Sequence, residues 1–319
     1  MVIYIISDGK KGHLSQTRGL AGALVARAQK LRPDTAHSVH EVDITGKGYF
    51  AKMFYKGKDL ADLPKPDLVL CAGHGTHLAA LSLARRMKSL CMVCMRPSLP
   101  LRMFDLCIMP RHDVPENREP GKNTFCTNGA INCIHPRPDI PKTETLILVG
   151  GPSKSYAWDA ELLLTQLANI VHHNSTPMVL TTSRRTPQDF IHDLQAACPS
   201  IHAVPVEETS ADWVPVHLSR AREVWVTQDS VSMVYEALSS GAPVGILEMQ
   251  EAPQRGKKGD KKKLPRVARG LQMLVKDGMV HTFTEWAKSS HSLPTQATVI
   301  NEAARTADYI LERFPRLLP

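Results

Sequence analysis

The sequence predicts an α/β protein made of two domains, each built on a parallel sheet. Short apolar runs rich in β-branched residues alternate with longer helix-forming stretches, which is the pattern of parallel sheets with crossover helices. At 319 residues the chain is long enough for two full cores. Residues 134–142, IHPRPDIPK, contain three prolines in nine positions, so they have the composition of a linker between two halves.

Strands are expected where a short apolar run ends at Gly, Ser, Asp or Pro, and helices where apolar residues recur with helical spacing. In the first half this predicts strands at Val2–Ile6, Val39–Asp43, Leu68–Cys71, Leu90–Met95 and Leu106–Met109, and helices at Leu14–Lys30, His77–Lys88 and part of Tyr49–Leu60. In the second half it predicts strands at Thr145–Val149, Met178–Thr182, Ile201–Pro205, Glu223–Thr227 and Val244–Leu247, and helices at Trp158–His172, Pro187–Ala197, Val214–Arg220 and Met233–Ser239. The last segment, Thr295–Phe314, is an amphipathic helix that either completes the second domain or crosses back to the first.

Composition indicates a cytoplasmic globular protein. The chain is 43% apolar and 22% charged, and no apolar run approaches the ~18 residues of a membrane span. The apolar run at the N-terminus is too short for a signal peptide, because Asp8, Lys10 and Lys11 end it. Seven scattered cysteines suit a reducing compartment. Cys91 and Cys94 have the CxxC spacing but lie within a predicted strand, which argues against a zinc or redox site.

The net charge of +8 is concentrated in one segment, residues 255–269. Eight basic residues and one acid lie there, so the segment holds +7 of the total. Few aromatic residues accompany them, and nucleic acid is therefore not an expected partner. Two interpretations stay open: a solvated loop, or a segment that binds anionic lipid, a glycolipid or an anionic substrate at the inner membrane surface.

Polar residues with catalytic potential follow the predicted strands of the first domain. Gly9 and Gly12 flank a turn that delivers His13 to the start of a helix, with Asp8 five residues earlier. A histidine oriented by a carboxylate suits deprotonation of an acceptor hydroxyl, so His13 and Asp8 are the candidate catalytic pair. The candidate acceptor-side residues are Gly9 and Gly12 of this turn, together with Gly73, His74, Gly75 and Arg96, which follow the next strands.

Three loops of the second domain have the composition of a phosphate site. Each follows a predicted strand, and the carboxyl ends of parallel strands meet at one edge of a sheet. The third loop opens a helix, whose free N–H groups attract anions, and Glu236 lies one turn further on, where it would accept from a sugar hydroxyl. The candidate donor-binding residues are Gly150, Gly151, Ser153, Lys154, Ser183, Arg184, Arg185, Asp229, Ser230, Ser232 and Glu236.

Several common sites are excluded by missing motifs. The sequence has no GxxxxGK[ST] element and no GxGxxG after its first strand, which argues against a P-loop NTPase and a dinucleotide oxidoreductase. It also has no Asp-x-Asp triplet and no His-x-x-x-His pair, so neither a metal nor another cofactor is expected. A leaving diphosphate would then rely on basic side chains and helix dipoles.

The motifs together resemble a known family. SDGKKGHLSQTRGLAGAL, RPSLPLRMFDLCIMPRHD, TNGA, GGPSKSYAWD, TSRRTP and VTQDSVSMVYEALSSGAPV resemble the bacterial members of the mitochondrial-fission "elongated mitochondria" family, from Ile3 to about Leu247. The resemblance implies two Rossmann-like domains that face each other across a cleft, in the glycosyltransferase-B arrangement. The layout is more distantly similar to the enzyme that adds N-acetylglucosamine to a lipid-linked muramyl peptide, and His13 and Glu236 match its Gly-rich-loop His and donor-domain Glu.

These inferences lead to one hypothesis and two alternatives. Residues 1–135 would be the acceptor-side domain, 143–294 the nucleotide-sugar donor domain, and 295–319 a C-terminal helix. The leading hypothesis is a metal-independent glycosyltransferase that uses a nucleotide-activated sugar, with a cell-envelope glycolipid as one acceptor class. The alternatives are a non-catalytic adaptor that binds a partner or a membrane, and a nucleotide-sugar 2-epimerase.

Overall fold

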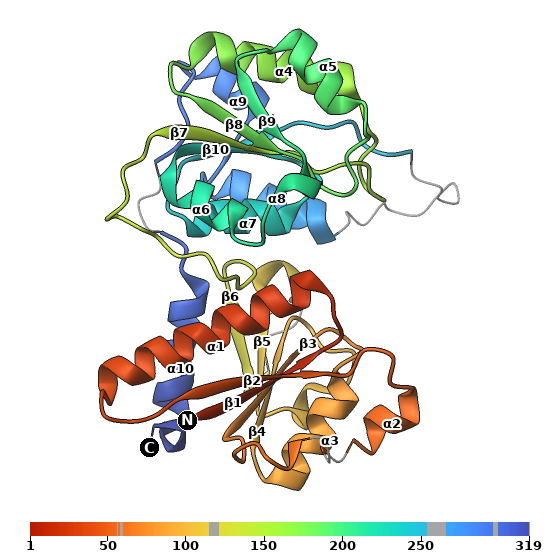
Figure 1. Cartoon of the computed structure of the whole chain (residues 1–319), viewed down its shortest axis with the longest axis vertical. Coiled ribbons are helices and arrows are strands. Elements are labelled where there is room, and N and C mark those ends of the chain that lie inside the picture. The colour runs from red at the N-terminus through yellow and green to blue at the C-terminus, as the bar shows by residue number, and fades with distance from the viewer. Residues whose placement is uncertain (56, 58–59, 115–120, 254–265, 296–298, 319) are drawn as a thin grey trace. The chain divides into compact units, whose positions relative to one another are not determined.

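The computed structural model describes residues 1–55, 57, 60–114, 121–253, 266–295 and 299–318 (Figure 1). The chain divides into two compact units. Unit 1 comprises Met1–Cys133 and Ile300–Pro319, and unit 2 comprises Ile134–Val299. The C-terminal helix therefore belongs to unit 1, although it is separated from the rest of that unit in sequence by the whole of unit 2.

Unit 1 is built on a six-stranded parallel sheet with the order β2-β1-β3-β4-β5-β6. Every residue of the three strands β3, β4 and β5 is buried, which is expected of strands that helices cover on both faces. The strands are β1 (Val2–Ser7), β2 (Ser38–Asp43), β3 (Leu68–Ala72), β4 (Leu90–Cys94), β5 (Leu106–Pro110) and β6 (Thr124–Thr127).

Helices cover both faces of this sheet. Ile3 and Ile5 of β1 pack with α1 (Lys11–Leu31) and α10 (Glu302–Arg313) in one core. Tyr4 and Ile6 point to the opposite face, because successive strand residues alternate, and there they pack with α3 (His77–Met87). The short helix α2 (Tyr49–Met53) lies on the α3 side, away from α1 and α10 (Figure 1).

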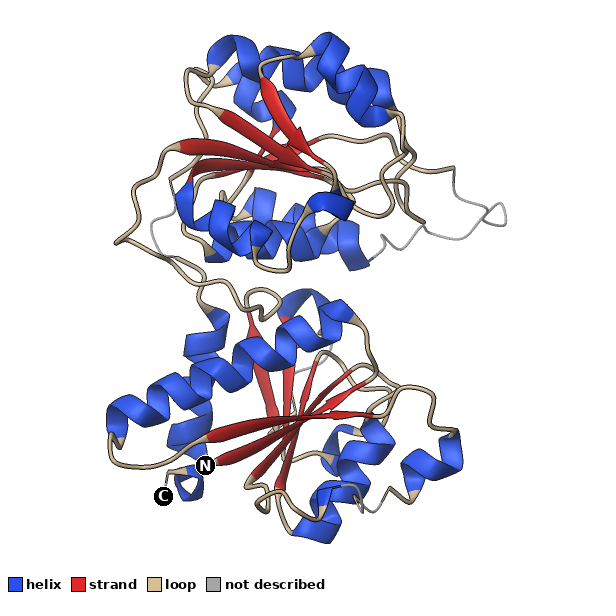
Figure 2. Cartoon of the chain, viewed as in Figure 1, coloured by secondary structure: helices blue, strands red, loops and turns tan. Residues whose placement is uncertain are grey.

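Unit 2 contains a second six-stranded parallel sheet, with the order β12-β11-β10-β7-β8-β9. Helices again lie on both sides of the strands (Figure 2). Its strands are β7 (Glu144–Leu148), β8 (Met178–Thr181), β9 (Ile201–Val204), β10 (Ala221–Thr227), β11 (Val244–Leu247) and β12 (His281–Thr282). Its helices are α4 (Ala160–His173), α5 (Phe190–Ala197), α6 (Trp213–Arg220), α7 (Val231–Ser239), α8 (Arg266–Lys276) and α9 (Phe283–Lys288). Short 3₁₀ helices at Leu101–Met103, Arg111–Asp113, Val206–Glu208 and Pro315–Leu317 complete the two units.

The predicted fold class is confirmed: the chain has two α/β units, each with a parallel sheet. Two strands and two α-helices were not predicted. The strands β6 and β12 are short edge strands, whose residues give little periodic signal. The helix α8 begins within the basic segment, and the helix α9, which has only six residues, follows that segment. Most of that basic segment, residues 255–265, lies outside the described residues.

The structure also explains the CxxC spacing. Cys91 packs in the core on the α3 face of the sheet, and Cys94 in the core on the α1 face. The two thiols therefore point in opposite directions and do not share a ligand. Among the described residues, no helix is long and apolar enough to cross a membrane.

Candidate functional site

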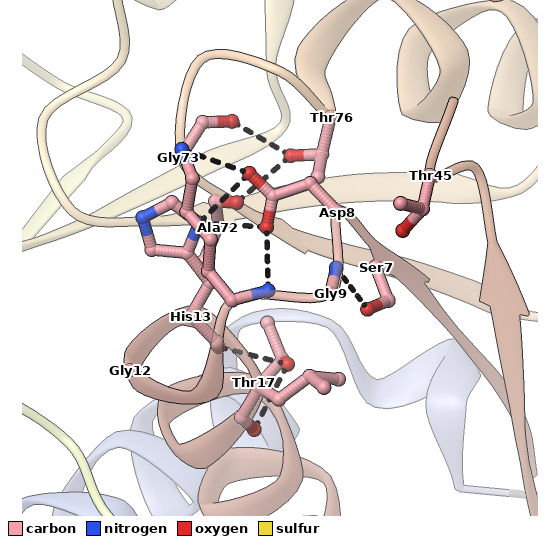
Figure 3. Close-up of polar contacts among 12 residues, drawn as sticks. Ser7, Asp8, Gly9, Gly12, His13, Thr17, Thr45, Ala72, Gly73 and Thr76 are labelled. Atoms are coloured by element: carbon pink, nitrogen blue, oxygen red, sulfur yellow. Dashed lines mark hydrogen bonds and ion pairs between the residues drawn. The ribbon is translucent and has the colours of Figure 1, made fainter. Parts of the chain in front are cut away.

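The predicted catalytic pair forms in unit 1, at the carboxyl end of β1. His13 lies in the first turn of α1, and its Nδ1 is 2.9 Å from Oδ1 and 3.1 Å from Oδ2 of Asp8 (Figure 3). Because an ionised carboxylate only accepts hydrogen bonds, Nδ1 of the neutral imidazole donates, and Nε2 keeps its lone pair. The His13 side chain is 20% exposed and the Asp8 side chain 9%, so solutes reach the imidazole more readily than its partner.

The charge state of Asp8 is fixed by its neighbours. Burial raises the pKa of the Asp8 carboxyl, but the hydrogen bond and charge of His13 and the backbone N–H and charge of Lys10 lower it overall. The Lys10 ammonium lies 3.4 Å from Oδ2. The carboxylate is therefore ionised at neutral pH and suited to orienting His13 and to stabilising its protonated form.

Gly73 determines where the His13 ring lies. It has a φ of +80°, and a Cβ added there would lie 2.0 Å from Cε1 and 2.4 Å from Nδ1 of His13. Only glycine gives both this conformation and this space. The loop after β3 thus forms one side of the space that the His13 ring occupies. Figure 3 shows Gly73 of this loop beside the His13 side chain.

The other predicted unit 1 residues surround the pair to different degrees. A Cβ on Gly75 would lie 3.4 Å from Oδ2 of Asp8, whereas His74 and Arg96 are exposed. Gly9 has a φ of +76° and adjoins Thr45, as a tight turn requires. The expected turn role of Gly12 is wrong, because Gly12 lies in the regular first turn of α1 with open space around its Cα.

His77 was missed by the sequence analysis. It opens α3, is 2% exposed, and its Nδ1 lies 3.2 Å from Oγ of Ser98. Its Nε2 is buried with no hydrogen-bond partner among the described residues. Burial, with the neighbouring charges of His74 and His13, lowers the pKa of His77 to about 4. The His-x-x-His spacing of His74 and His77 was the available signal.

In unit 2, the three predicted loops follow three neighbouring strands. The strands β10, β7 and β8 are adjacent in the sheet, so the loops after them meet at its carboxyl edge. The loop after β11 joins them, because Ala157 and Ala252 donate backbone hydrogen bonds of 2.9 Å to Gln250 and Ser155, respectively. This fourth loop was not among the predicted site segments.

Asp229 and Arg185 bind each other and brace these loops. The Asp229 side chain is completely buried, and its Oδ2 accepts from Arg185 at 2.6 Å and from the Gly151 N–H at 3.2 Å. Arg185 also donates to the carbonyl of Gly151 at 3.0 Å. A Cβ on Gly150 would lie 2.2 Å from Asp229, and one on Gly151 2.3 Å from the Arg185 carbonyl. This close approach explains the glycine pair.

The predicted serines divide into two groups. The Ser153 hydroxyl accepts from the N–H groups of Ser155 and Tyr156 at 3.2 and 3.1 Å, and the Ser183 hydroxyl accepts from the Arg185 N–H at 3.2 Å, so both stabilise loop conformation. Ser230 is the N-cap residue of α7 but makes no capping hydrogen bond, and Ser232 is exposed in the first turn. The first-turn N–H groups of α7 are thus left without a side-chain cap.

Two exposed cations lie on the same loops. Lys154 follows the glycine pair after β7, and Arg184 follows β8. Neither forms an ion pair within the part of the chain that the structure describes, in contrast to Arg185. Lys154 and Arg184 are therefore the side chains at this edge that remain available for an anion.

Glu236 is the titratable group that the fold perturbs most in unit 2. It lies on the second turn of α7, only partly exposed, and burial raises the pKa of its carboxyl to about 7. Its carboxylate has no hydrogen-bond or ion-pair partner among the described residues. A carboxylate in such surroundings gains from donors that a ligand brings, such as sugar hydroxyls.

Among the described residues, no three His, Cys, Asp or Glu side chains gather in a way that would hold a metal ion.

A family model described as mitochondrial fission ELM1 matches residues 11–314. The chain belongs to the mitochondrial fission ELM1 family. It is also 26% identical over 300 residues to an uncharacterized protein of Rickettsia prowazekii, in a match that covers 77% of this chain and 83% of that protein.

Solved structures similar to this ELM1-family chain share its fold across both units. A candidate UDP-N-acetylglucosamine 2-epimerase from Listeria monocytogenes matches with a TM-score of 0.62 and 14% identity, over 99% of this chain and 96% of that one. The UDP-GlcNAc 2-epimerase from Methanocaldococcus jannaschii matches with a TM-score of 0.55 and 13% identity, over 98% of this chain and 100% of that one. The UDP-GlcNAc 2-epimerase from Neisseria meningitidis matches with a TM-score of 0.54 and 12% identity, over 99% of each chain. The fold of this chain is therefore glycosyltransferase-B-like.

Proposed function

We propose that this protein is a metal-independent glycosyltransferase that uses a nucleotide-activated sugar. The observation that carries the proposal is the His13–Asp8 pair, a carboxylate-oriented imidazole with a free Nε2 at the carboxyl edge of a parallel sheet. Neither residue belongs to the two apolar cores of unit 1 that the described residues form. An oriented imidazole of this kind suits general base catalysis.

In the proposed reaction, Nε2 of His13 takes the proton of an acceptor hydroxyl as its oxygen attacks the anomeric carbon of the donor. The bond from that carbon to the nucleoside diphosphate breaks, and the diphosphate leaves with the electron pair. Lys154, Arg184 and the uncapped N–H groups of α7 offset its charge. Glu236 accepts from hydroxyls of the ribose or the sugar. Asp229 and Arg185 are positioning residues, since they form an ion pair with each other and hold the loops together.

Calorimetric titration with UDP-, CMP-, GDP- and ADP-sugars, without added metal, tests the proposal. One nucleotide class should bind, and Lys154→Ala should weaken it roughly 10- to 100-fold, the loss expected for one charged hydrogen-bond donor. Lys30→Ala, which removes an exposed lysine of α1, should bind like the wild type. His13→Ala should keep the donor affinity and lose turnover. Equal loss of both properties in the His13 and Lys154 variants would contradict this division of roles.

A nucleotide-sugar 2-epimerase is the second candidate. All three solved structures reported above carry that name, and the one from Neisseria meningitidis holds UDP-GlcNAc. An epimerase would convert the bound nucleotide-sugar with no acceptor present, whereas a transferase would not. Failure of all four nucleotide classes to bind would instead favour the adaptor, a role closer to the family's description, which concerns mitochondrial fission.

A further inference from the structure

The short helix α2 presents aromatic side chains to solvent. Tyr49, Phe50 and Phe54 are 62%, 74% and 65% exposed. The other exposed large apolar side chains among the described residues are single and scattered, at Leu31, Val39, Val216 and Val299. Three exposed aromatic residues within six consecutive positions are unusual for a surface that faces only water.

The segment that carries these residues is fixed to the fold. Tyr55 lies two residues after the end of α2, is 6% exposed, and packs in the core on the α3 side of the sheet. The Ser82 hydroxyl of α3 donates to the Tyr55 carbonyl at 3.1 Å. Tyr55 is therefore in the core, whereas Tyr49, Phe50 and Phe54 are on the surface. Figure 1 shows α2 at the outer side of unit 1. The exposed aromatics thus belong to an anchored element.

The sequence that contains α2 is rich in lysine. In the sequence, residues 44–58 contain four lysines and no acidic residue. Lys47 lies 5.5 Å from the centroid of the Tyr55 ring, and Lys52 lies within α2. Neither lysine forms an ion pair with another described residue. Exposed aromatics beside unpaired lysines match an anionic lipid surface, where rings settle at headgroup level and ammonium groups meet phosphates.

We propose that α2, with Lys47, Lys52, Tyr49, Phe50 and Phe54, is the surface through which this protein binds anionic membranes. A second copy of the chain is a poorer occupant, because a two-fold interface would oppose lysines to lysines. Lys52 Nζ lies 4.0 Å from where a Gly75 Cβ would stand, and Gly75 adjoins Asp8. The lipid surface would then lie beside the His13–Asp8 pair. If the proposed function holds, this favours a lipid-linked acceptor.

Vesicle flotation of the full chain tests the proposal, with phosphatidylcholine alone and with about one third phosphatidylglycerol. The wild type should bind the anionic vesicles, less so at high salt. The double variant Phe50→Ser/Phe54→Ser should bind at least roughly 10-fold more weakly, since both rings leave the interface. Leu31→Ser is the matched control, because it removes an exposed apolar side chain at the C-terminal end of α1. This variant should bind like the wild type.

Two results would overturn the proposal. Absence of wild-type binding to either vesicle would assign the α2 aromatics to a protein partner. Undiminished binding of Phe50→Ser/Phe54→Ser that disappears when the lysines at 257–263 are changed to Gln would assign the membrane contact to the basic segment. His13→Ala should float like the wild type, so failure of the catalytic proposal leaves this test unaffected.

Discussion

Burial shifts the pKa values of His77 and Glu236 within the range that stability measurements cover, and the two shifts have opposite consequences for stability. His77 is kept neutral in unit 1, and Glu236 is kept partly protonated in unit 2. Both lie at the carboxyl edge of a parallel sheet, next to the residues of the proposed function. Each therefore gives a measurable pH dependence that reports on its own unit.

His77 should make the protein less stable as the pH falls. Its pKa is about 4 in the folded state against 6.5 in the unfolded chain, so unfolding takes up a proton between these values. The free energy of unfolding should decrease from pH 6.5 to pH 4 by up to about 3 kcal/mol from this group. Urea unfolding of His77→Gln at several pH values should show a flatter profile, whereas His192→Gln, at a side chain that is 88% exposed, should follow the wild type.

Glu236 should act in the other direction. Its pKa is raised to about 7 from 4.5, so the folded state holds a proton that the unfolded chain releases. The stability that this proton confers is complete below pH 4.5 and is lost as the pH rises through 7. Glu236→Gln should remove this loss and weaken donor binding, because an amide accepts sugar hydroxyls less strongly. A pH profile identical to that of the wild type would show that Glu236 titrates normally.

At the level of elements, the β3–α3 loop determines the geometry of the His13–Asp8 pair. Gly73→Ala would place a methyl group 2.0 Å from the His13 ring and impose a left-handed φ on alanine. We expect a loss of about 1–3 kcal/mol in stability, and displacement of the imidazole from Asp8. The free energy of unfolding and the His13 imidazole resonances in NMR measure the two effects.

Gly22→Ala is the matched control for that experiment. Gly22 is exposed within α1, has no atom within 4 Å of an added Cβ, and has no left-handed φ. The substitution should stabilise the helix by up to about 1 kcal/mol and leave His13 unchanged. A stable Gly73→Ala variant with an unshifted His13 would show that the loop does not position the imidazole.

At the level of the whole molecule, α10 links the end of the chain to unit 1. Glu302 is buried there and accepts from the Asn128 backbone N–H at 3.1 Å and from Arg305. Ile310 is completely buried in the core that α1 and β1 share. Unit 1 is therefore complete only after unit 2 has been synthesised.

Ile310→Ala should destabilise unit 1 by about 2–5 kcal/mol, because it leaves a cavity under α10. All four tryptophans belong to unit 2, so tryptophan fluorescence follows that unit and far-UV circular dichroism follows both. We expect the circular dichroism transition to move to lower temperature and the fluorescence transition to stay. Ile170→Ala, an equivalent change in the unit 2 core, should instead move the fluorescence transition to lower temperature, together with the part of the circular dichroism transition that unit 2 contributes. A joint shift of both transitions in Ile310→Ala would show that the units unfold together.

Local patterns in the sequence were enough to predict the α/β class, the order of the long elements and the loops that bear polar residues. Hydrophobic periodicity and glycine or proline stops are local signals, and strands such as Leu68–Ala72 are apolar throughout. The Asp8–His13 pairing could be predicted for the same reason, since both residues lie within the short connection from β1 to the first turn of α1. Tertiary structure decided what depends on distant neighbours. The close approach of Gly73 to His13, the ion pair of Arg185 with Asp229, the burial of His77 and the return of α10 to unit 1 each join segments far apart in the chain, where spacing carries no information.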